Sequence, residues 1–454
     1  MQKLLIANRG EIACRIIRSA RALGLATVAV HSEVDRDALH VASADEAVAL
    51  RGNTARESYL DVDQLLAAAR SSGADALHPG YGFLAENAVF AQAVQDSGLT
   101  WVGPAPQTIE AMGDKVRARA IAQAAGVPLL PGSERLLPGA LDGLEAIAAT
   151  VGYPLLVKAS GGGGGIGMQR VDGPETLRKT VSSTQALAQR AFGDAAVFLE
   201  RYVAHARHIE IQVFGFGDGR ALHMFERECS IQRRFQKIVE ESPSTALNAG
   251  LRQRMASAAV ALAQAQRYAG VGTVEFVFDD DRGEFHFLEM NTRIQVEHPV
   301  TELLTGLDLV ALQLQLAAGQ PIALTQADVR ARGHAIELRL CAENPAKNDL
   351  PATGRLETLV FATGPGLRVD TGVRAGDAIS HYYDPLLAKL IAHGEDRAQA
   401  IDRLAQALAA TQVQGPATNL ALLRRLLAHP AFVAGRTHTS FLAEHRTSLL
   451  AEAG

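Results

Sequence analysis

Two neighbouring segments that both read as β-strands carry glutamates that face each other if the strands pair. The segment TVEFVF at 273–278 and the segment EMNTRIQVEHP from Glu289 are separated by a polar, glycine-containing stretch, 279–284, which predicts a turn. In a hairpin centred on Arg282, Glu275 lies opposite Glu289, because each is seven residues from the centre. Two carboxylates about 4 Å apart repel by on the order of 4 kcal/mol at an effective dielectric constant of about 20, so a sheet that pairs them needs compensation.

A divalent cation would supply that compensation. Oxygen ligands from Glu275, Glu289 and Asn291 suit Mg²⁺, which shares its remaining coordination positions with water and substrate phosphates. Two alternatives stay open at this point: a register shifted by one residue, or a solvated hairpin face that holds no metal.

The segment from Glu289 cannot be one straight strand if its polar residues serve one site. Glu289, Asn291, Arg293, Gln295 and Glu297 alternate with mainly apolar residues. At roughly 3.3 Å per residue, a straight strand would separate Glu289 from Glu297 by about 26 Å. We therefore expect the chain to leave the sheet and curl after Asn291.

A second constraint is a run of five glycines that follows a buried-type strand. Residues 153–159 (YPLLVKA) place Lys158 near the end of this strand, and Gly161 to Gly165 follow Ser160. Such a run can close over a ligand and offer N–H groups to phosphate, whereas a plain flexible linker is the alternative. The Walker A form is excluded, because no GK[ST] follows and 168–171 continue as a strand.

The two ends of the chain differ in their predicted architecture. Strands near 4–7, 27–30, 74–77 and 101 alternate with helices at 11–23, at 63–70 and up to Ser97, which predicts a doubly wound parallel sheet. The turn at 8–11 is not GxGxxG and gives no support to dinucleotide binding. The last 115 or so residues predict an α+β unit, with strands at 334–340, 357–361 and 386–391 and helices at 397–411 and 419–428.

Between these ends lie polar segments whose role is ambiguous. The segment 207–213 alternates like a half-buried strand with His208 on its polar face, and 334–340 does the same with Arg339. By default, His208 is a surface histidine or one whose hydrogen bonds are satisfied within the protein, and Arg339 is a surface residue. Residues 226–241 are dense in charged residues and glutamines, and we expect either a solvated connection or an anion-handling loop there.

Composition excludes several classes of protein. A formal charge of −5 provides no basic footprint for nucleic acid and no polybasic membrane patch. The cysteines Cys14, Cys229 and Cys341 form no CxxC pair, so neither a zinc site nor a disulfide framework is expected. With no signal-peptide core and no apolar run of spanning length, we expect a cytoplasmic protein with no nucleic-acid or membrane partner.

Eight stretches of the chain resemble the motifs of biotin carboxylase, the ATP-grasp component of biotin-dependent carboxylases. They are IANRGEIACRI from Ile6, HPGYGFLAEN from His78, MGDK from Met112, KASGGGGGIGM from Lys158, RHIEIQV from Arg207, ERECSIQRRFQKIVEE from Glu226, EMNTRIQVEHPVTE from Glu289 and YYDPLLAKL from Tyr382. Each stretch is weak by itself, but their joint order, over nearly the whole chain, is highly specific.

The resemblance implies three domains. They are an α/β doubly wound N-terminal domain at 1–114, an ATP-grasp α+β domain at 115–330 with a glycine-rich lid at about 131–203, and an α+β C-terminal domain at 331–446, followed by a tail at 447–454.

The resemblance also implies a reaction in two steps. Bicarbonate and ATP, with Mg²⁺ or Mn²⁺, give carboxyphosphate and ADP, and the carboxyl group then passes to the ureido nitrogen of biotin.

Residue roles follow from the same resemblance. The nucleotide would be bound by Lys115, Lys158, Gly163, Gly164, Gly165, Glu200, Val203, His208 and Gln232. The metal ligands would be Glu275, Glu289 and Asn291, and bicarbonate would contact Lys237, Arg293, Gln295 and Val296. Glu297 would be the base that deprotonates bicarbonate, and Arg339 would stabilise the enolate-like oxygen of biotin. Lys237, Arg293, Glu297 and Arg339 are thus the expected catalytic residues.

Two positions depart from the family pattern, and several partners are implied. Ile166 stands where the family commonly has arginine or lysine, and Phe235 where a polar side chain is expected. No Met-Lys-Met biotinylation motif occurs, so biotin is expected on a carrier protein or domain, with a carboxyltransferase component and a homodimer as further partners. The Glu297-His298-Pro299 pattern is typical of the acyl-CoA carboxylase type, which serves fatty acid metabolism. Two alternatives are another ATP-grasp carboxylate ligase and a nucleotide-binding assembly subunit without catalytic activity.

Overall fold

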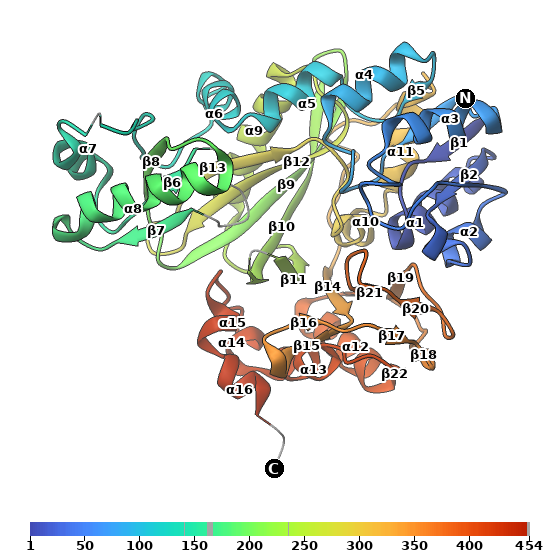
Figure 1. Cartoon of the computed structure of the whole chain (residues 1–454). Helices are drawn as coiled ribbons and strands as arrows, with labels where there is room; N and C mark the ends of the chain where they lie inside the picture. The colour runs from blue at the N-terminus through green and yellow to red at the C-terminus, as the bar shows by residue number, and fades with distance from the viewer. Residues whose placement is uncertain (140, 161–166, 235, 452–454) are drawn as a thin grey trace.

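The computed structural model describes residues 1–139, 141–160, 167–234 and 236–451. Gly163, Gly164, Gly165, Ile166 and Phe235 lie outside the described residues. Figure 1 shows the N-terminal domain and the lid at opposite ends of a central sheet, with the C-terminal helices packed below it.

The N-terminal sheet has five parallel strands in the order β3-β2-β1-β4-β5. Its elements are β1 (Lys3–Ile6), α1 (Gly10–Ala22), β2 (Ala26–His31), the 3₁₀ turn η1 (Glu33–Asp35), α2 (Leu39–Ser43), β3 (Glu46–Ala49), α3 (Val62–Ser72), β4 (Ala76–His78), α4 (Ala88–Asp96) and β5 (Thr100–Trp101). Because β1 is central and the chain winds outward in both directions, this order confirms the predicted doubly wound domain. The strand β3 was not predicted, because it is an edge strand whose residues are mostly exposed.

The central sheet has eight antiparallel strands in the order β13-β12-β9-β10-β11-β14-β21-β19. The strands are β9 (Ala206–Phe216), β10 (Ala221–Arg233), β11 (Gln236–Ser242), β12 (Ala269–Asp279), β13 (Glu284–Asn291), β14 (His334–Cys341), β19 (Leu367–Thr371) and β21 (Leu386–Gly394). The helices that accompany them are α5 (Pro106–Gly113), α6 (Lys115–Ala124), α9 (Ala249–Ala265), α10 (His298–Thr305) and α11 (Leu309–Ala317). Through the β11–β14 pairing, the sheet runs from residues of the central domain into those of the C-terminal domain without a break.

The predicted hairpin forms between β12 and β13, and it pairs Glu275 with Glu289 as expected. The ladder next to the turn, however, pairs Phe276 with Phe287, and the register shifts by one residue before Glu275. Continued without this bulge, the ladder would bring Leu288 opposite Glu275. The count from Arg282 therefore gave the right pair only because a bulge inserts one residue into β13.

The segment 226–241 is neither of the two alternatives expected for it. Residues 226–233 belong to β10 and residues 236–241 to β11, which are inner strands of the central sheet. Its first charged residues are buried and paired: Glu226 with Arg252 at 2.8 Å, and Glu228 with Arg207 at 3.0 Å. The charge density of the segment therefore reflects ion pairing within the protein rather than solvation.

The lid contains a small antiparallel sheet in the order β7-β6-β8. Its elements are α7 (Leu144–Val151), β6 (Leu155–Ala159), β7 (Met168–Val171), α8 (Pro174–Phe192) and β8 (Val197–Arg201). The described residues on either side of the glycine run, Ala159 and Gly167, are joined by a backbone hydrogen bond of 2.9 Å. The glycine run thus connects the ends of two paired strands, β6 and β7, as predicted.

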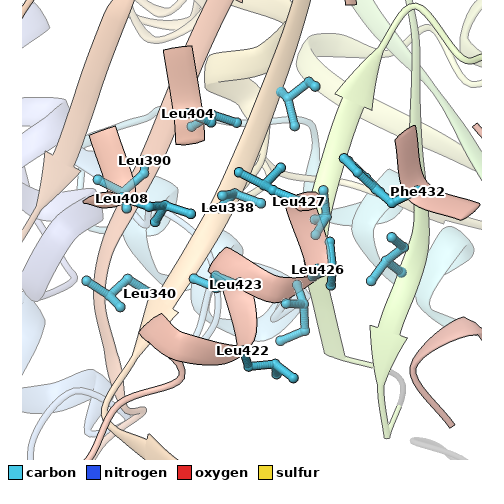
Figure 2. Close-up of a cluster of buried hydrophobic side chains, with 14 of the residues drawn as sticks. Leu338, Leu340, Leu390, Leu404, Leu408, Leu422, Leu423, Leu426, Leu427 and Phe432 are labelled. Atoms are coloured by element: carbon cyan, nitrogen blue, oxygen red, sulfur yellow. The ribbon is translucent and has the colours of Figure 1, made fainter. Parts of the chain in front are cut away.

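Apolar side chains join the C-terminal helices to β14 and β21. Figure 2 shows Leu338 and Leu340 among leucines of α12 (Arg397–Ala410) and α13 (Leu420–Ala428), with Phe432 farther to the right in the same cluster. The remaining elements are short: β15 (Glu343–Asn344), the 3₁₀ turn η2 (Pro345–Lys347), β16 (Leu350–Pro351), β17 (Gly354–Arg355), β18 (Thr358–Val360), β20 (Ala378–Ile379), β22 (Gln412–Gln414), α14 (Pro430–Val433), α15 (Phe441–Glu444) and α16 (Arg446–Leu450).

Replacing Leu423 by alanine should destabilise this core strongly. Leu423 is fully buried in the cluster, so truncation removes apolar contacts and leaves a cavity, which costs roughly 2–5 kcal/mol. Calorimetric unfolding measures the loss. Leu350→Ala is the matched control, because that side chain is 56% exposed and should change stability by less than about 0.5 kcal/mol. Equal effects of the two changes would contradict this assignment of the core.

Within the described residues, no single helix has the length and apolar composition needed to cross a membrane. The helices α10 and α11 meet those criteria only as a pair that bends by 96°.

Candidate functional site

A cleft of about 790 Å³ lies between the lid and the central sheet. Among the residues predicted to bind the nucleotide, all those that the structure describes line this cleft: Lys115, Lys158, Glu200, Val203, His208 and Gln232. Apolar side chains such as Phe198, Val277 and Met290 form part of its wall, and Glu289 and Asn291 also border it. A cleft with an apolar wall and convergent charged groups suits a ligand that has a flat base and phosphates.

The lid and the central domain contribute cations to the cleft from different elements. Lys158 on β6 donates to Glu200 Oε2 on β8 at 2.5 Å, and Arg119 contacts the other oxygen of that carboxylate at 3.2 Å. Lys115 is the first residue of α6, whose N-cap Asp114 accepts hydrogen bonds from two backbone N–H groups. The predicted contacts of these residues with ATP stay predictions.

The carboxylates of Glu275 and Glu289 stand in very different surroundings. Burial raises the pKa of Glu275, but the ammonium of Lys237 and the imidazole of His208, 2.9 Å away, outweigh it and hold that pKa well below its usual value. The pKa of Glu289 is raised, first by burial and then by the charge of Glu275. Lys115 and His208 lower the pKa of Glu289, but they do not outweigh burial and the charge of Glu275. A divalent cation between the two carboxylates would supply the remaining positive charge. The Asn291 amide donates to Glu275 Oε1 at 2.8 Å and so borders the same position.

A second group of ligand atoms lies on the other side of Glu275. Atoms of His208, Glu210 and Glu275 lie within 4.8 Å of one another and could also surround a cation. The Lys237 ammonium already contacts two of these residues, Glu210 at 2.6 Å and Glu275 at 2.9 Å. Since this cation meets the charge requirement there, the geometry favours the Glu275–Glu289 side for a metal.

Lys237 is the centre of the charged cluster. Besides Glu210 and Glu275, its ammonium donates to Glu297 Oε1 at 2.7 Å. The curl predicted after Asn291 is present, because β13 ends at Asn291 and α10 begins at His298 with Glu297 as its N-cap. This turn brings Glu297 to the lysine that contacts Glu275, over a distance that a straight strand could not close.

The surroundings of Glu297 favour its ionised form. Burial favours its neutral form, but Lys237, Arg339 and Arg227 outweigh burial and hold its pKa far below the usual value. A carboxylate so strongly stabilised is a weak base. It gains basicity when its cations are shared with another anion, such as bicarbonate or a phosphate.

Arg339 on β14 connects Glu297 to a second carboxylate. It donates to Glu297 Oε2 at 2.9 Å and to Glu240 Oε1 at 2.7 Å. Burial raises the pKa of Glu240 to about 7, although Arg339 opposes this effect, and burial also raises that of Glu337, which stands opposite Glu240 in the sheet. Since neither Glu337 oxygen has a hydrogen-bond partner among the described residues, we expect this carboxyl group to be protonated.

The other residues predicted to contact bicarbonate, Arg293, Gln295 and Val296, are part of the curl between β13 and α10. Gln295 donates to Glu275 Oε1 at 2.7 Å, and the Val296 carbonyl accepts from Lys389 at 2.8 Å. Arg293 donates to Glu86 at 2.8 Å and to Asn291 at 3.0 Å. The structure thus brings Lys237, Gln295 and Glu297 together around Glu275, and it places Arg293 at the side of this group.

Three charged residues of the cluster, Glu210, Arg227 and Glu240, were not predicted from the sequence. Glu210 faces Glu275 across β9 and β12, and it accepts from the buried Arg227 at 2.5 Å. Glu210 follows His208 on the polar face of β9, so the alternation that singled out His208 also contained this signal. Arg227 and Glu240 lie in the segment that was predicted to be a solvated connection or an anion-handling loop. They belong to the motif that starts at Glu226, but the motif gave no role to either residue.

Models of protein families match three consecutive parts of the chain. Residues 1–109 match "Biotin carboxylase, N-terminal domain", residues 114–325 match "Carbamoyl-phosphate synthase L chain, ATP binding domain", and residues 337–444 match "Biotin carboxylase C-terminal domain". Together these matches cover most of the chain.

Whole proteins and solved structures are similar over the same length. The chain is 48% identical to biotin carboxylase of Nostoc sp. over 97% of this chain and 98% of that protein. It is 46% identical to the mitochondrial methylcrotonoyl-CoA carboxylase subunit alpha of Arabidopsis thaliana, and it spans 62% of the length of that subunit. A crystal structure of the biotin carboxylase domain dimer of Hydrogenobacter thermophilus 2-oxoglutarate carboxylase, with MgADP, ADP and bicarbonate, superimposes with a TM-score of 0.92 at 41% identity, over 100% of this chain and 99% of that one. The chain therefore belongs to the biotin carboxylase family.

Proposed function

We propose that this chain carboxylates biotin at the expense of ATP and bicarbonate, by way of carboxyphosphate. The observation that carries the proposal is the position of Lys237. One ammonium group contacts Glu275 of the predicted metal pair and Glu297, the predicted base. The site for phosphate and the site for bicarbonate therefore share a cation, as a reaction that joins the two substrates requires.

In the first step, Glu297 accepts the proton of bicarbonate, and the freed oxygen attacks the γ-phosphorus of ATP. The bond from this phosphorus to the β–γ bridging oxygen breaks, and ADP leaves. Lys115 and Lys158 would bind the phosphates from the cleft. Glu275 and Glu289, with Asn291 beside them, would hold Mg²⁺ or Mn²⁺, which adds positive charge around the phosphates when bound.

In the second step, the carboxyl group passes to the ureido nitrogen of biotin and phosphate is released. The bond between the carboxyl carbon and the phosphate oxygen breaks, the departing phosphate accepts the proton of the ureido nitrogen, and negative charge develops on the ureido oxygen as this proton leaves. The Arg339 guanidinium, held by Glu240 and Glu297, is the preorganised cation that would stabilise this oxygen.

The proposal extends to partners. Relatives such as the Arabidopsis carboxylase subunit are longer than this chain, and the similar Hydrogenobacter domain is a dimer. We therefore propose that biotin is presented by a carrier protein or domain, that a carboxyltransferase component uses the carboxybiotin, and that the chain forms a homodimer. The acyl-CoA carboxylase type is the proposed setting.

Release of ADP by the purified chain tests the proposed function. With MgATP present, we expect hydrolysis to depend on bicarbonate and to increase when free biotin is added. Equal ADP release with and without bicarbonate would refute the proposal. Stimulation by a different carboxylate, with no effect of bicarbonate, would instead favour another ATP-grasp ligase.

A further inference from the structure

A fully buried lysine, Lys389 on β21, lies behind the curl that carries the predicted base. Its side chain is 0% exposed, and its ammonium donates to the carbonyl oxygen of Val296 at 2.8 Å. We propose that Lys389 is a positioning residue, which fixes the peptide group between Val296 and Glu297 and thereby orients Glu297 toward bicarbonate. The inference rests on the proposed function.

The geometry of the peptide bond explains how one hydrogen bond can do this. A trans peptide is planar, so its N–H points away from its carbonyl group. With the Val296 carbonyl held by Lys389, the N–H of Glu297 faces the opposite side of the chain. Holding this peptide plane restricts ψ of Val296 and φ of Glu297, and so the direction in which the Glu297 side chain leaves the backbone. Its carboxylate is then held by Lys237 and Arg339.

The preceding peptide is fixed by a different residue. His298 Nδ1 lies 2.7 Å from the carbonyl oxygen of Gln295. Burial, with the nearby charge of Lys389, keeps the pKa of His298 well below its usual value, so its imidazole is neutral and can donate from Nδ1. Two successive carbonyls of the curl are thus held by side chains that lie outside the cleft lining.

The charge of Lys389 is balanced by carboxylates of the N-terminal and C-terminal domains. Its ammonium lies 2.8 Å from Glu11 on α1 and 3.9 Å from Asp370 on β19, and Tyr81 donates to the second oxygen of Glu11 at 2.5 Å. A buried cation costs several kcal/mol in desolvation, and a hydrophobic side chain in a repacked site often replaces an ion pair without loss of stability. Neutralising Glu11 therefore does not by itself account for a lysine here, whereas holding a backbone carbonyl does.

Kinetics of Lys389→Met test the inference. Methionine fills the space of the lysine stem but cannot donate, so we expect kcat/KM for bicarbonate to fall by roughly 10–100-fold, as for a small misplacement of a catalytic group. The affinity for MgATP, measured by calorimetry, should change by less than about twofold, because Lys389 does not line the nucleotide cleft. If Lys389 contributed only to stability, kcat/KM for bicarbonate and the affinity for MgATP would change together.

The variant Lys389→Met/Glu11→Gln separates positioning from charge balance. It removes both members of the ion pair, so neither position 11 nor position 389 is left with an unpaired charge. We expect it to keep the bicarbonate defect, whereas Glu11→Gln should stay within about threefold of wild type.

Each other outcome would overturn the inference. Recovery of kcat/KM for bicarbonate in the double variant would show that Lys389 only neutralises Glu11. Wild-type kinetics of Lys389→Met, or failure of the charge-balanced variant to fold and bind MgATP, would also remove the positioning role. Failure of the proposed function can be told apart from failure of the positioning role. In that case the wild-type chain itself would show no dependence of ADP release on bicarbonate.

Discussion

Replacing Glu297 by glutamine should lower bicarbonate-dependent ADP release by roughly 10²–10⁴-fold, the usual contribution of a general base. The amide cannot accept the proton of bicarbonate, although it has nearly the shape of the carboxylate. Binding of MgATP should persist, because Glu297 does not line the nucleotide cleft. Steady-state ADP release and calorimetric titration with MgATP measure the two quantities.

The control for Glu297→Gln is Glu284→Gln. Glu284 is an exposed residue at the start of β13, on the strand that carries Glu289, and it should retain wild-type turnover. Unchanged turnover in Glu297→Gln would remove Glu297 from the role of base. Loss of both turnover and MgATP binding would mean that the change had disrupted the cluster around Lys237.

Replacing Arg339 by methionine should reduce the carboxylation of biotin by roughly 10²–10³-fold, as the loss of a preorganised group at a developing oxyanion does. The change also leaves Glu240 and Glu297 without their shared cation, which should cost about 3–5 kcal/mol of stability. Incorporation of labelled bicarbonate into biotin measures the first effect, and chemical denaturation the second.

Arg339→Lys separates the two roles of the arginine. Lysine keeps the positive charge between the carboxylates but lacks the planar fork that contacts both of them, so most of the stability should return while carboxylation stays impaired. Full recovery of carboxylation in Arg339→Lys would show that only the charge is required at this position.

The sequence predicted the parts of the site that local patterns encode. Alternation and the position of a turn were enough to pair Glu275 with Glu289 and to expect a curl after Asn291. The bulge beside Glu275 could not be foreseen, because it depends on how β13 packs as well as on its composition. The count from the turn happened to include the inserted residue.

Charge density was misleading where burial depends on distant partners. The segment 226–241 has the composition of an exposed connection, yet it forms inner strands, because Glu226, Arg227 and Glu228 find opposite charges on β9 and α9. No periodicity within the segment reveals such partners.

Contacts between domains were the least predictable part of the site. Lys389 lies 93 residues from Val296 in the chain, and Glu11 belongs to the N-terminal helix α1. Motifs indicated that both stretches matter, but the sequence gives no distance between them. Only the assembled fold shows that one ammonium group joins all three domains at the curl.

The fate of oxygen from labelled bicarbonate tests the central claim, that bicarbonate itself attacks ATP in the cleft. With bicarbonate labelled by ¹⁸O, attack on the γ-phosphorus followed by transfer of the carboxyl group leaves one bicarbonate oxygen on the released phosphate. Mass spectrometry of the phosphate should therefore find one ¹⁸O for each ADP formed in the presence of biotin. Unlabelled phosphate at the same rate of ADP release would contradict the account, because water would then be the attacking group.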